Sequence, residues 1–182
     1  MKPRKTMEWT RLDNAAKIFP SNSSKRDTKV FRFSCELNEP VDPEVLQAAA
    51  DKTLGQFPVY RSVMKRGLFW YYLETSDRKP IVKLEDEPPC GPLYNADIKG
   101  LLFEVTYFRN RINLEVYHAL SDGTGALQFL RVLVYHYLTM KHAALFAGGR
   151  LPAIDYDASF SQKDDSFQKY SRKPRDKEKT NV

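Results

Sequence analysis

Asn113-Leu-Glu-Val-Tyr-His118-Ala-Leu-Ser-Asp122-Gly123-Thr-Gly125 is the stretch on which the fold of this chain depends. A β-rich run ends at His118, a short polar turn follows, and an apolar run begins at Ala126. Histidine is the side chain whose unperturbed pKa lies nearest neutrality, so a histidine held at the end of a strand can accept a proton. His118 is therefore the leading catalytic candidate.

The runs on either side of this stretch predict a hairpin and a buried helix. Residues 101–108 and 111–118 are β-rich and are separated by Arg109-Asn110, which predicts a tight antiparallel hairpin. Residues 126–140 are apolar nearly all round, so the helix that they predict should be largely buried.

The first third of the chain predicts a helix or turn, a strand and a second helix. Residues 9–19 have near-helical spacing and favour a short helix or turn. Residues 29–37 alternate, which predicts a half-buried strand. Asp42 directly precedes Pro43, and this pair predicts an N-cap and first helical turn, with Gly55 closing the helix.

Residues 57–73 predict an aromatic hairpin, and the segment after it is less regular. Two β-rich runs, 57–64 and 68–73, are joined by Lys65-Arg66-Gly67. Residues 74–100 are rich in Pro, Gly and charge, and we expect an irregular crossing segment with one brief strand at 81–84.

The net charge of +6 comes from the two ends of the chain. Residues 1–30 carry eight basic and three acidic side chains, and residues 161–182 carry seven and four. A nucleic-acid-binding protein would rather show basic and aromatic residues together on a folded face. We therefore expect no nucleic-acid partner, a flexible N-terminus at 1–8, a folded unit over 9–160, and a charged tail or severed linker at 161–182.

Cysteine content and hydropathy predict a cytoplasmic protein. Cys35 and Cys90 are the two cysteines, too few for a disulfide framework and wrongly spaced for a zinc site. No apolar run is long enough to span a bilayer, and the basic N-terminus is not followed by the apolar stretch of a secretory signal.

The pattern His118-x-x-x-Asp122-Gly123 resembles the HxxxDG signature of the chloramphenicol acetyltransferase-like (CAT-like) superfamily, which includes condensation domains and alcohol O-acetyltransferases. The longer string His-Ala-Leu-Ser-Asp-Gly-Thr-Gly-Ala is most similar to bacterial alcohol acetyltransferase-type proteins. The segment Phe57-Pro58-Val59-Tyr60-Arg61 is similar to their Pro-x-x-Arg segment. The resemblance implies an α+β fold: a CAT-like single lobe, with a mostly antiparallel or mixed β-sheet and helices packed on one face, as half of a two-lobed acyltransferase.

The resemblance also implies a role for each motif residue. His118 would be the general base that removes a proton from an acceptor hydroxyl or amine as it attacks an acyl thioester. Asp122 would pair with Arg61 and fix the loop that carries His118. Gly123 would keep the channel wall free of a side chain. The cosubstrate would be acyl-CoA or a similar thioester, with no tightly bound cofactor and no metal.

The sequence departs from the pattern in two respects. Tyr117 stands where many condensation domains have a second histidine. Two-lobed members are roughly twice as long, and the Asp-Phe-Gly-Trp-like motif of their second lobe is absent here. The chain is then half of an enzyme, a natural single-lobe protein, or a protomer completed by a neighbour. About sixty residues follow His118, which favours the two-lobed architecture over the trimeric one.

Two function hypotheses follow. The first is an acyltransferase lobe that needs a second lobe or another protomer and is inactive alone. The second is a non-catalytic binding or scaffold domain with the same fold. A metal site built from His118, Asp122, His136 and His142 is disfavoured because helix residues six apart do not share a face. A nucleophilic role for Ser121 is weak because no base can be assigned to it.

Overall fold

The computed structural model of the chain describes residues 9–12, 16–24, 26–68, 70–94, 100–147 and 149. The regions predicted as a flexible N-terminus, 1–8, and as a charged tail or linker, 161–182, lie outside the described residues. Within the described part of the chain, no helix is long and apolar enough to cross a membrane.

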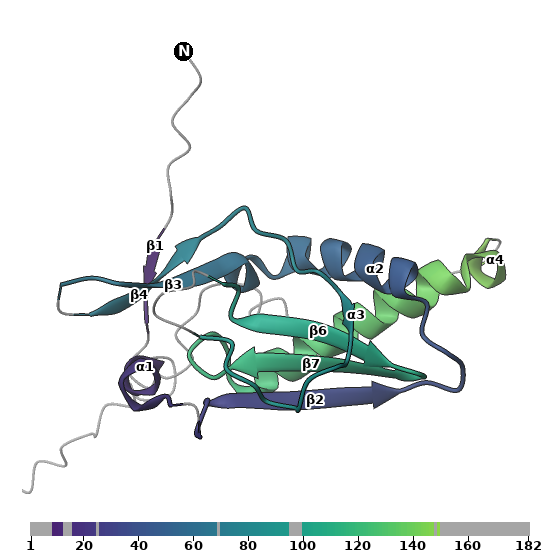
Figure 1. Cartoon of the computed structure of the whole chain (residues 1–182). Helices are drawn as coiled ribbons and strands as arrows, with labels where there is room; N and C mark the ends of the chain where they lie inside the picture. The colour runs from purple at the N-terminus through teal and green to yellow at the C-terminus, as the bar shows by residue number, and fades with distance from the viewer. Residues whose placement is uncertain are drawn as a thin grey trace, which may run out of the picture.

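The main sheet has four strands in the order β2-β7-β6-β5, and it is mixed (Figure 1). The central pair, β6 (Phe103–Phe108) and β7 (Arg111–Tyr117), is antiparallel, and β2 (Val30–Glu36) lies antiparallel to β7. The short β5 (Lys83–Leu84) is parallel to β6. The predicted hairpin and the strand predicted over 29–37 are therefore confirmed.

The strand register gathers apolar residues on one face of this sheet. Leu114 lies opposite Phe33 on one neighbouring strand and opposite Val105 on the other. Since side chains alternate with a period of two, the even-numbered residues of β7 share this face. The hairpin turn holds Arg109 at a φ of 53°, and the Asn110 side-chain amide donates to the carbonyl of Leu37 at 2.7 Å.

Two long helices, α2 (Pro43–Gln56) and α3 (Gly123–Lys141), pack against each other and cover the apolar face. Figure 1 shows α3 running behind the main sheet, with α2 beside it. The predicted N-cap of α2 is confirmed, since Asp42 Oδ1 accepts the backbone N–H groups of Glu44 and Val45. The helix continues through Gly55 instead of ending there. The described residues form one hydrophobic core, whose largest fully buried side chains are Tyr60, Tyr117, Tyr137, Phe57, Phe129, Leu46, Leu102, Ile112, Leu114, Leu133, Val105 and Val116.

A second sheet, in the order β1-β4-β3, corrects two expectations. β1 (Trp9–Arg11) pairs with β4 (Tyr71–Thr75), so the helix or turn predicted from residue 9 is wrong at its start. The first arm of the predicted aromatic hairpin is also wrong in part. Its residues Pro58–Arg61 form the 3-10 helix η2, and β3 (Ser62–Arg66) starts only after it.

Three short helices complete the described structure. η1 (Ala16–Ile18) and α1 (Phe19–Asn22) follow β1, and α4 (Ala143–Phe146) follows α3. Pro20 lies inside α1, where its fixed φ suits a first helical turn. The helix or turn predicted from the sequence was expected to end at residue 19, before this proline.

Candidate active site

His118 is the first residue after β7, at the end of the central strand of the main sheet. Its backbone N–H donates to the carbonyl of Lys29 at 2.9 Å, which ties the start of the loop to the residue before β2. The side chain is half-buried. The loop therefore leaves the sheet at a fixed point and presents the imidazole at the sheet end.

Two aromatic rings hold the imidazole of His118. The ring of Phe19 stacks on it with 5.1 Å between centroids and an interplanar angle of 17°. Phe31 lies 4.5 Å away at 47°. Among the described residues, neither ring nitrogen of His118 forms a hydrogen bond. The ring is thus oriented by apolar contacts, and its nitrogens are not engaged by another side chain of the described chain.

Phe31 lies in the strand predicted over 29–37, whereas nothing in the sequence pointed to Phe19. Phe19 reaches His118 only because α1 folds back over the end of the main sheet. Contacts between residues about a hundred positions apart are set by tertiary packing and leave no local pattern.

Tyr117, at the position where many condensation domains have a second histidine, is a buried anchor in this chain. Its hydroxyl shares a hydrogen bond of 2.8 Å with Ser23 Oγ, and its ring stacks on Tyr94 at 5.5 Å. Burial raises the pKa of Tyr117, and the Ser23 hydroxyl opposes that shift. Successive strand residues point to opposite faces, so Tyr117 is directed away from the face that carries Phe31.

Asp122 supports the loop as the N-cap of α3. Its Oδ1 accepts the backbone N–H of Gly125 at 2.8 Å, which satisfies one of the free donors of the first helical turn. This cap explains why α3 begins at Gly123 instead of at the predicted Ala126.

The ion pair expected between Arg61 and Asp122 is not formed among the described residues. The guanidinium of Arg61 lies 3.8 Å from Asp77, and both side chains are substantially exposed, at 43% and 72%. The Arg61 carbonyl accepts the N–H of Ser76, so this end of η2 faces the β4 side of the second sheet. Asp122 meanwhile finds its partner within its own helix, where a backbone donor is already in place.

Among the described glycines, Gly125 has the tightest surroundings, and the sequence did not single it out. A Cβ on Gly125 would lie 2.4 Å from Ser121 Oγ and 3.3 Å from Asp122 Oδ1. At Gly123 the nearest atom would be Phe33 Cζ, at an ordinary 3.8 Å. The helical apolar pattern after residue 126 hid this contact, because it says nothing about how tightly the preceding loop packs.

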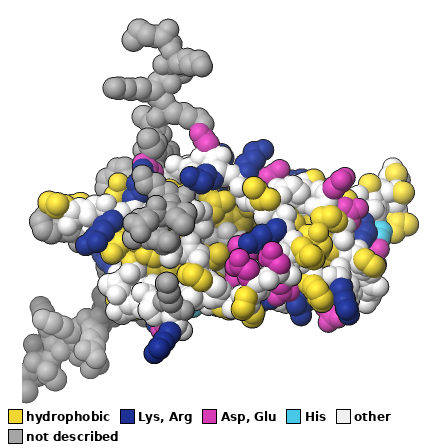
Figure 2. Space-filling view, viewed as in Figure 1, with side chains coloured by type: hydrophobic (Ala, Val, Ile, Leu, Met, Phe, Trp, Pro, Cys, Tyr) yellow, Lys and Arg dark blue, Asp and Glu magenta, His cyan; other side chains and the backbone are white. Residues whose placement is uncertain are grey.

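The opposite face of the main sheet carries a network of charged side chains (Figure 2). Arg32 on β2 donates from Nε to Glu115 Oε1 at 2.7 Å and also pairs with Glu85. The guanidiniums of Arg32 and then Arg111 hold the pKa of Glu85 below its usual range. Glu115 also accepts the N–H of Cys90, so the network fastens the crossing segment onto the sheet.

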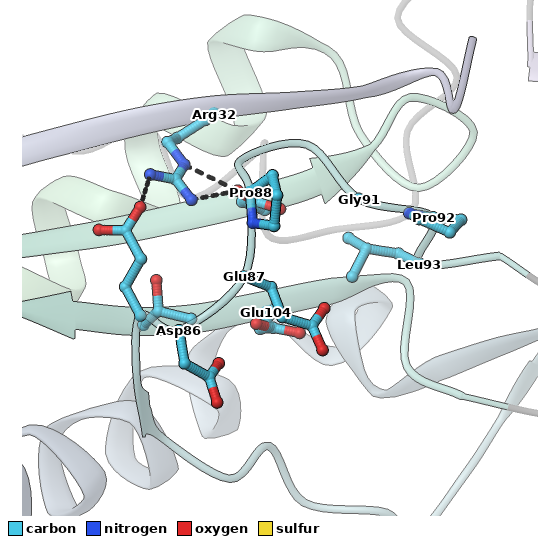
Figure 3. A pocket seen from close by; sticks show the side chains of 11 residues that line it. Arg32, Asp86, Glu87, Pro88, Gly91, Pro92, Leu93 and Glu104 are labelled. Carbon is cyan, nitrogen blue, oxygen red and sulfur yellow. Dashed lines mark hydrogen bonds and ion pairs between the residues drawn. The ribbon is translucent and has the colours of Figure 1, made fainter. Parts of the chain in front are cut away.

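A hollow of about 130 Å³ lies beside this network (Figure 3). Arg32, Asp86, Glu87 and Glu104 contribute polar groups to its wall, and Pro88, Gly91, Pro92 and Leu93 close it. No residue of the HxxxDG motif lines it. Its acidic groups mainly clamp the crossing segment, so it is not the candidate active site.

The remaining histidines lie in separate environments. The amide nitrogen of Gln56 lies 2.9 Å from His136 Nε2, and His142 Nε2 lies 2.6 Å from Glu39 Oε1. Across the described ranges, no group of three or more His, Cys, Asp or Glu side chains is arranged to hold a metal ion.

The mixed sheet with two helices on one face and a histidine at the end of its central strand is a single lobe of the CAT-like fold, the fold of the condensation domains. Three solved structures illustrate the likeness. A variant of the starter condensation domain of rhizomide synthetase RzmA in complex with C8-CoA is 14% identical, with a TM-score of 0.61 over 82% of this chain and 38% of that chain. The first condensation domain of the calcium-dependent antibiotic synthetase, in complex with a substrate analogue, is 17% identical, with a TM-score of 0.58 over 82% and 40%. The tallysomycin biosynthesis protein TlmII is 13% identical, with a TM-score of 0.57 over 72% and 38%.

These comparisons confirm the fold class expected from the sequence. The chain spans about two fifths of the length of these structures. At such low identity the likeness concerns the fold. No family model matches the chain, and no curated protein matches it.

Proposed function

We propose that this chain is the histidine-bearing lobe of an acyltransferase, which transfers an acetyl or other acyl group from a CoA-type thioester to an alcohol or an amine. The observation that carries the proposal is the placement of His118. Its imidazole stands at the end of β7, oriented by Phe19 and Phe31, with ring nitrogens that no described side chain engages.

In the proposed reaction a ring nitrogen of His118 accepts the proton of the acceptor hydroxyl or amine. The acceptor oxygen or nitrogen attacks the thioester carbonyl, and the carbon–sulfur bond then breaks. The thiolate of coenzyme A leaves and takes up the proton from the imidazolium. A positioned base of this kind typically contributes about 10²–10⁴-fold to the rate.

Two observations support the cosubstrate and the need for more protein. Structural neighbours include condensation domains solved with C8-CoA, which supports an acyl-CoA donor. This chain covers 38% of one of those chains. We therefore propose that a second lobe or another protomer supplies the facing wall of the site, and with it the groups that stabilise the developing oxyanion.

The alternative is a single-lobe binding or scaffold domain without catalysis. It is favoured by the hollow of the described structure, which lies at the charged network and not at His118. Such a domain would bind an acyl thioester or a protein partner and release no thiol.

Release of free coenzyme A thiol distinguishes the acyltransferase from the non-catalytic binding domain. The assay uses the protein encoded by the whole reading frame, acetyl-CoA or octanoyl-CoA as donor, and a panel of simple alcohols and amines. His118→Ala should lower the turnover rate by at least about 100-fold. His142→Ala is the matched control, because that histidine contacts Glu39 at the far end of α3, and it should leave turnover unchanged. Acyl-CoA binding measured by calorimetry, with no thiol release from any acceptor, would establish the binding domain instead.

A further inference from the structure

Tyr60 is a buried residue of η2 whose ring is fixed on several sides. It is 1% exposed. Its ring stacks on Phe129 of α3 at 4.2 Å and 19°, and the edges of Phe57 and Phe103 meet it at 6.0 Å and 5.1 Å. With the ring held in this way, the direction of its hydroxyl is fixed by the core.

The hydroxyl of Tyr60 is enclosed and forms no hydrogen bond with the described residues. Burial raises the pKa of Tyr60 far above its usual range. The Ser121 hydroxyl opposes this shift and the Asp122 carboxylate adds to it. Ser121 and Asp122 both belong to the loop that follows His118. Gly125, whose Cβ position lies 2.4 Å from Ser121 Oγ, precedes Phe129 by one helical turn, so the Tyr60 ring on Phe129 packs beside the first turn of α3, where that loop joins it.

Ser121 is the loop residue that can receive this hydroxyl. Its own O–H donates to the Asp122 carbonyl at 3.2 Å, which leaves the lone pairs of Oγ free to accept a hydrogen bond. Ser121 Oγ is tucked under the first turn of α3, in the space that Gly125 leaves open.

We propose that Tyr60 is a positioning residue that locks the His118 loop through Ser121. The Tyr60 O–H donates to Ser121 Oγ, Ser121 donates to the Asp122 carbonyl, and the Asp122 carboxylate holds the Gly125 N–H. This proposal rests on the proposed function, because the lock matters for catalysis only if His118 is the base. It gives Tyr60 the bracing role that the family resemblance implied for its neighbour Arg61.

A buried hydroxyl that merely lacks a partner behaves differently from one that locks a loop. Removing an orphaned hydroxyl relieves an unmet hydrogen bond, so the protein becomes slightly more stable and the loop does not change. Removing a locking hydroxyl loosens the loop. Tyr60→Phe keeps the stacked ring and deletes only this oxygen, so it separates the two cases.

The test measures amide hydrogen exchange by NMR at Gly125 and Leu120, whose N–H groups bond to Asp122 Oδ1 and to the Tyr117 carbonyl. Tyr60→Phe should speed exchange at both amides by roughly three- to tenfold, the factor expected for one lost hydrogen bond. Ser121→Ala should do the same, and the double variant should add little. Tyr107→Phe, on β6, should leave both amides unchanged.

Activity provides a second readout. In the thiol-release assay, Tyr60→Phe should lower kcat by roughly tenfold or less and leave KM unchanged, because the hydroxyl positions the base without touching either substrate. Unchanged exchange at Gly125 and Leu120 in Tyr60→Phe would overturn the lock, whatever the enzyme does. Faster exchange in a protein that releases no thiol would uphold the lock and overturn the proposed function alone.

Discussion

Gly125→Ala tests the packing under the first turn of α3. In a helix with open space, replacing glycine by alanine stabilises the fold by about 1 kcal/mol. Here the new Cβ would lie 2.4 Å from Ser121 Oγ, a separation that real Cβ atoms do not tolerate. Ser121 must rotate away and give up its 3.2 Å hydrogen bond to the Asp122 carbonyl.

The expected sign follows from comparing these effects. Overpacking a well-filled site costs about 1–3 kcal/mol, and the lost hydrogen bond costs about 1 kcal/mol more. After the gain in helix propensity of about 1 kcal/mol, Gly125→Ala should lower the free energy of unfolding by about 1–3 kcal/mol. This change should appear as a lower midpoint of urea unfolding with an unchanged slope.

A double-mutant cycle isolates the contact. With Ser121→Ala in place Oγ is gone, and the nearest atom of residue 121 is its Cβ, 3.8 Å from the new methyl group. In that background Gly125→Ala should be neutral or stabilising by up to about 1 kcal/mol, which gives a coupling energy of about 2 kcal/mol. Gly55→Ala, in α2 with nothing within 4 Å of its Cβ, is the matched control and should stabilise the protein.

Gly125→Ala contradicts this expectation if it stabilises the otherwise unchanged protein as much as Gly55→Ala does. Ser121 would then not occupy the space under the helix, and the route from Tyr60 to Asp122 would lose its middle residue. An equal effect of Gly125→Ala with and without Ser121 would lead to the same conclusion.

Two further predictions concern a buried histidine and the charged face of the main sheet. Burial, with the charge of Lys52 as a smaller cause, lowers the pKa of His136 from its ordinary 6.5. The unfolded chain then binds this proton more readily, so the free energy of unfolding should fall as the pH drops below 6.5, and His136→Leu should flatten that part of a urea-unfolding pH series. Glu115→Ala leaves Arg32 without one of its carboxylates at a site only 7% exposed, and it should lower the free energy of unfolding by about 2–4 kcal/mol in the same urea assay. Lys83→Ala breaks the exposed ion pair with Glu104 and should lower the free energy of unfolding by about 0.5 kcal/mol or less. Equal losses for the two variants would contradict a stabilising role of the Arg32–Glu115 pair.

Much of the main sheet and both long helices could be predicted because their signals are local. The alternation over residues 29–37, the two residues of the 109–110 turn and the Asp42-Pro43 pair each specify backbone conformation within a few residues. Such patterns act through side-chain period and capping, which do not depend on distant neighbours.

The incorrect predictions concern residues whose conformation depends on segments that are distant in the sequence. Residues 9–11 have a helix-like pattern, yet they pair with β4 about sixty residues later. Arg61 was assigned to Asp122 by resemblance, whereas η2 turns the guanidinium toward Asp77 and buries the neighbouring Tyr60 against α3. A one-residue change of direction in a 3-10 turn moves a side chain from the surface to the core.

In the HxxxDG stretch, some features are specified by the local sequence and others by tertiary packing. The sequence by itself determined that a strand ends at His118 and that a helix follows after a short turn, because strand period and helix period are local properties. Tertiary structure alone decided which rings hold His118 and which ring of α3 stacks on Tyr60. Those contacts join α1, β2, η2 and α3, and they exist only once the core has brought these segments together.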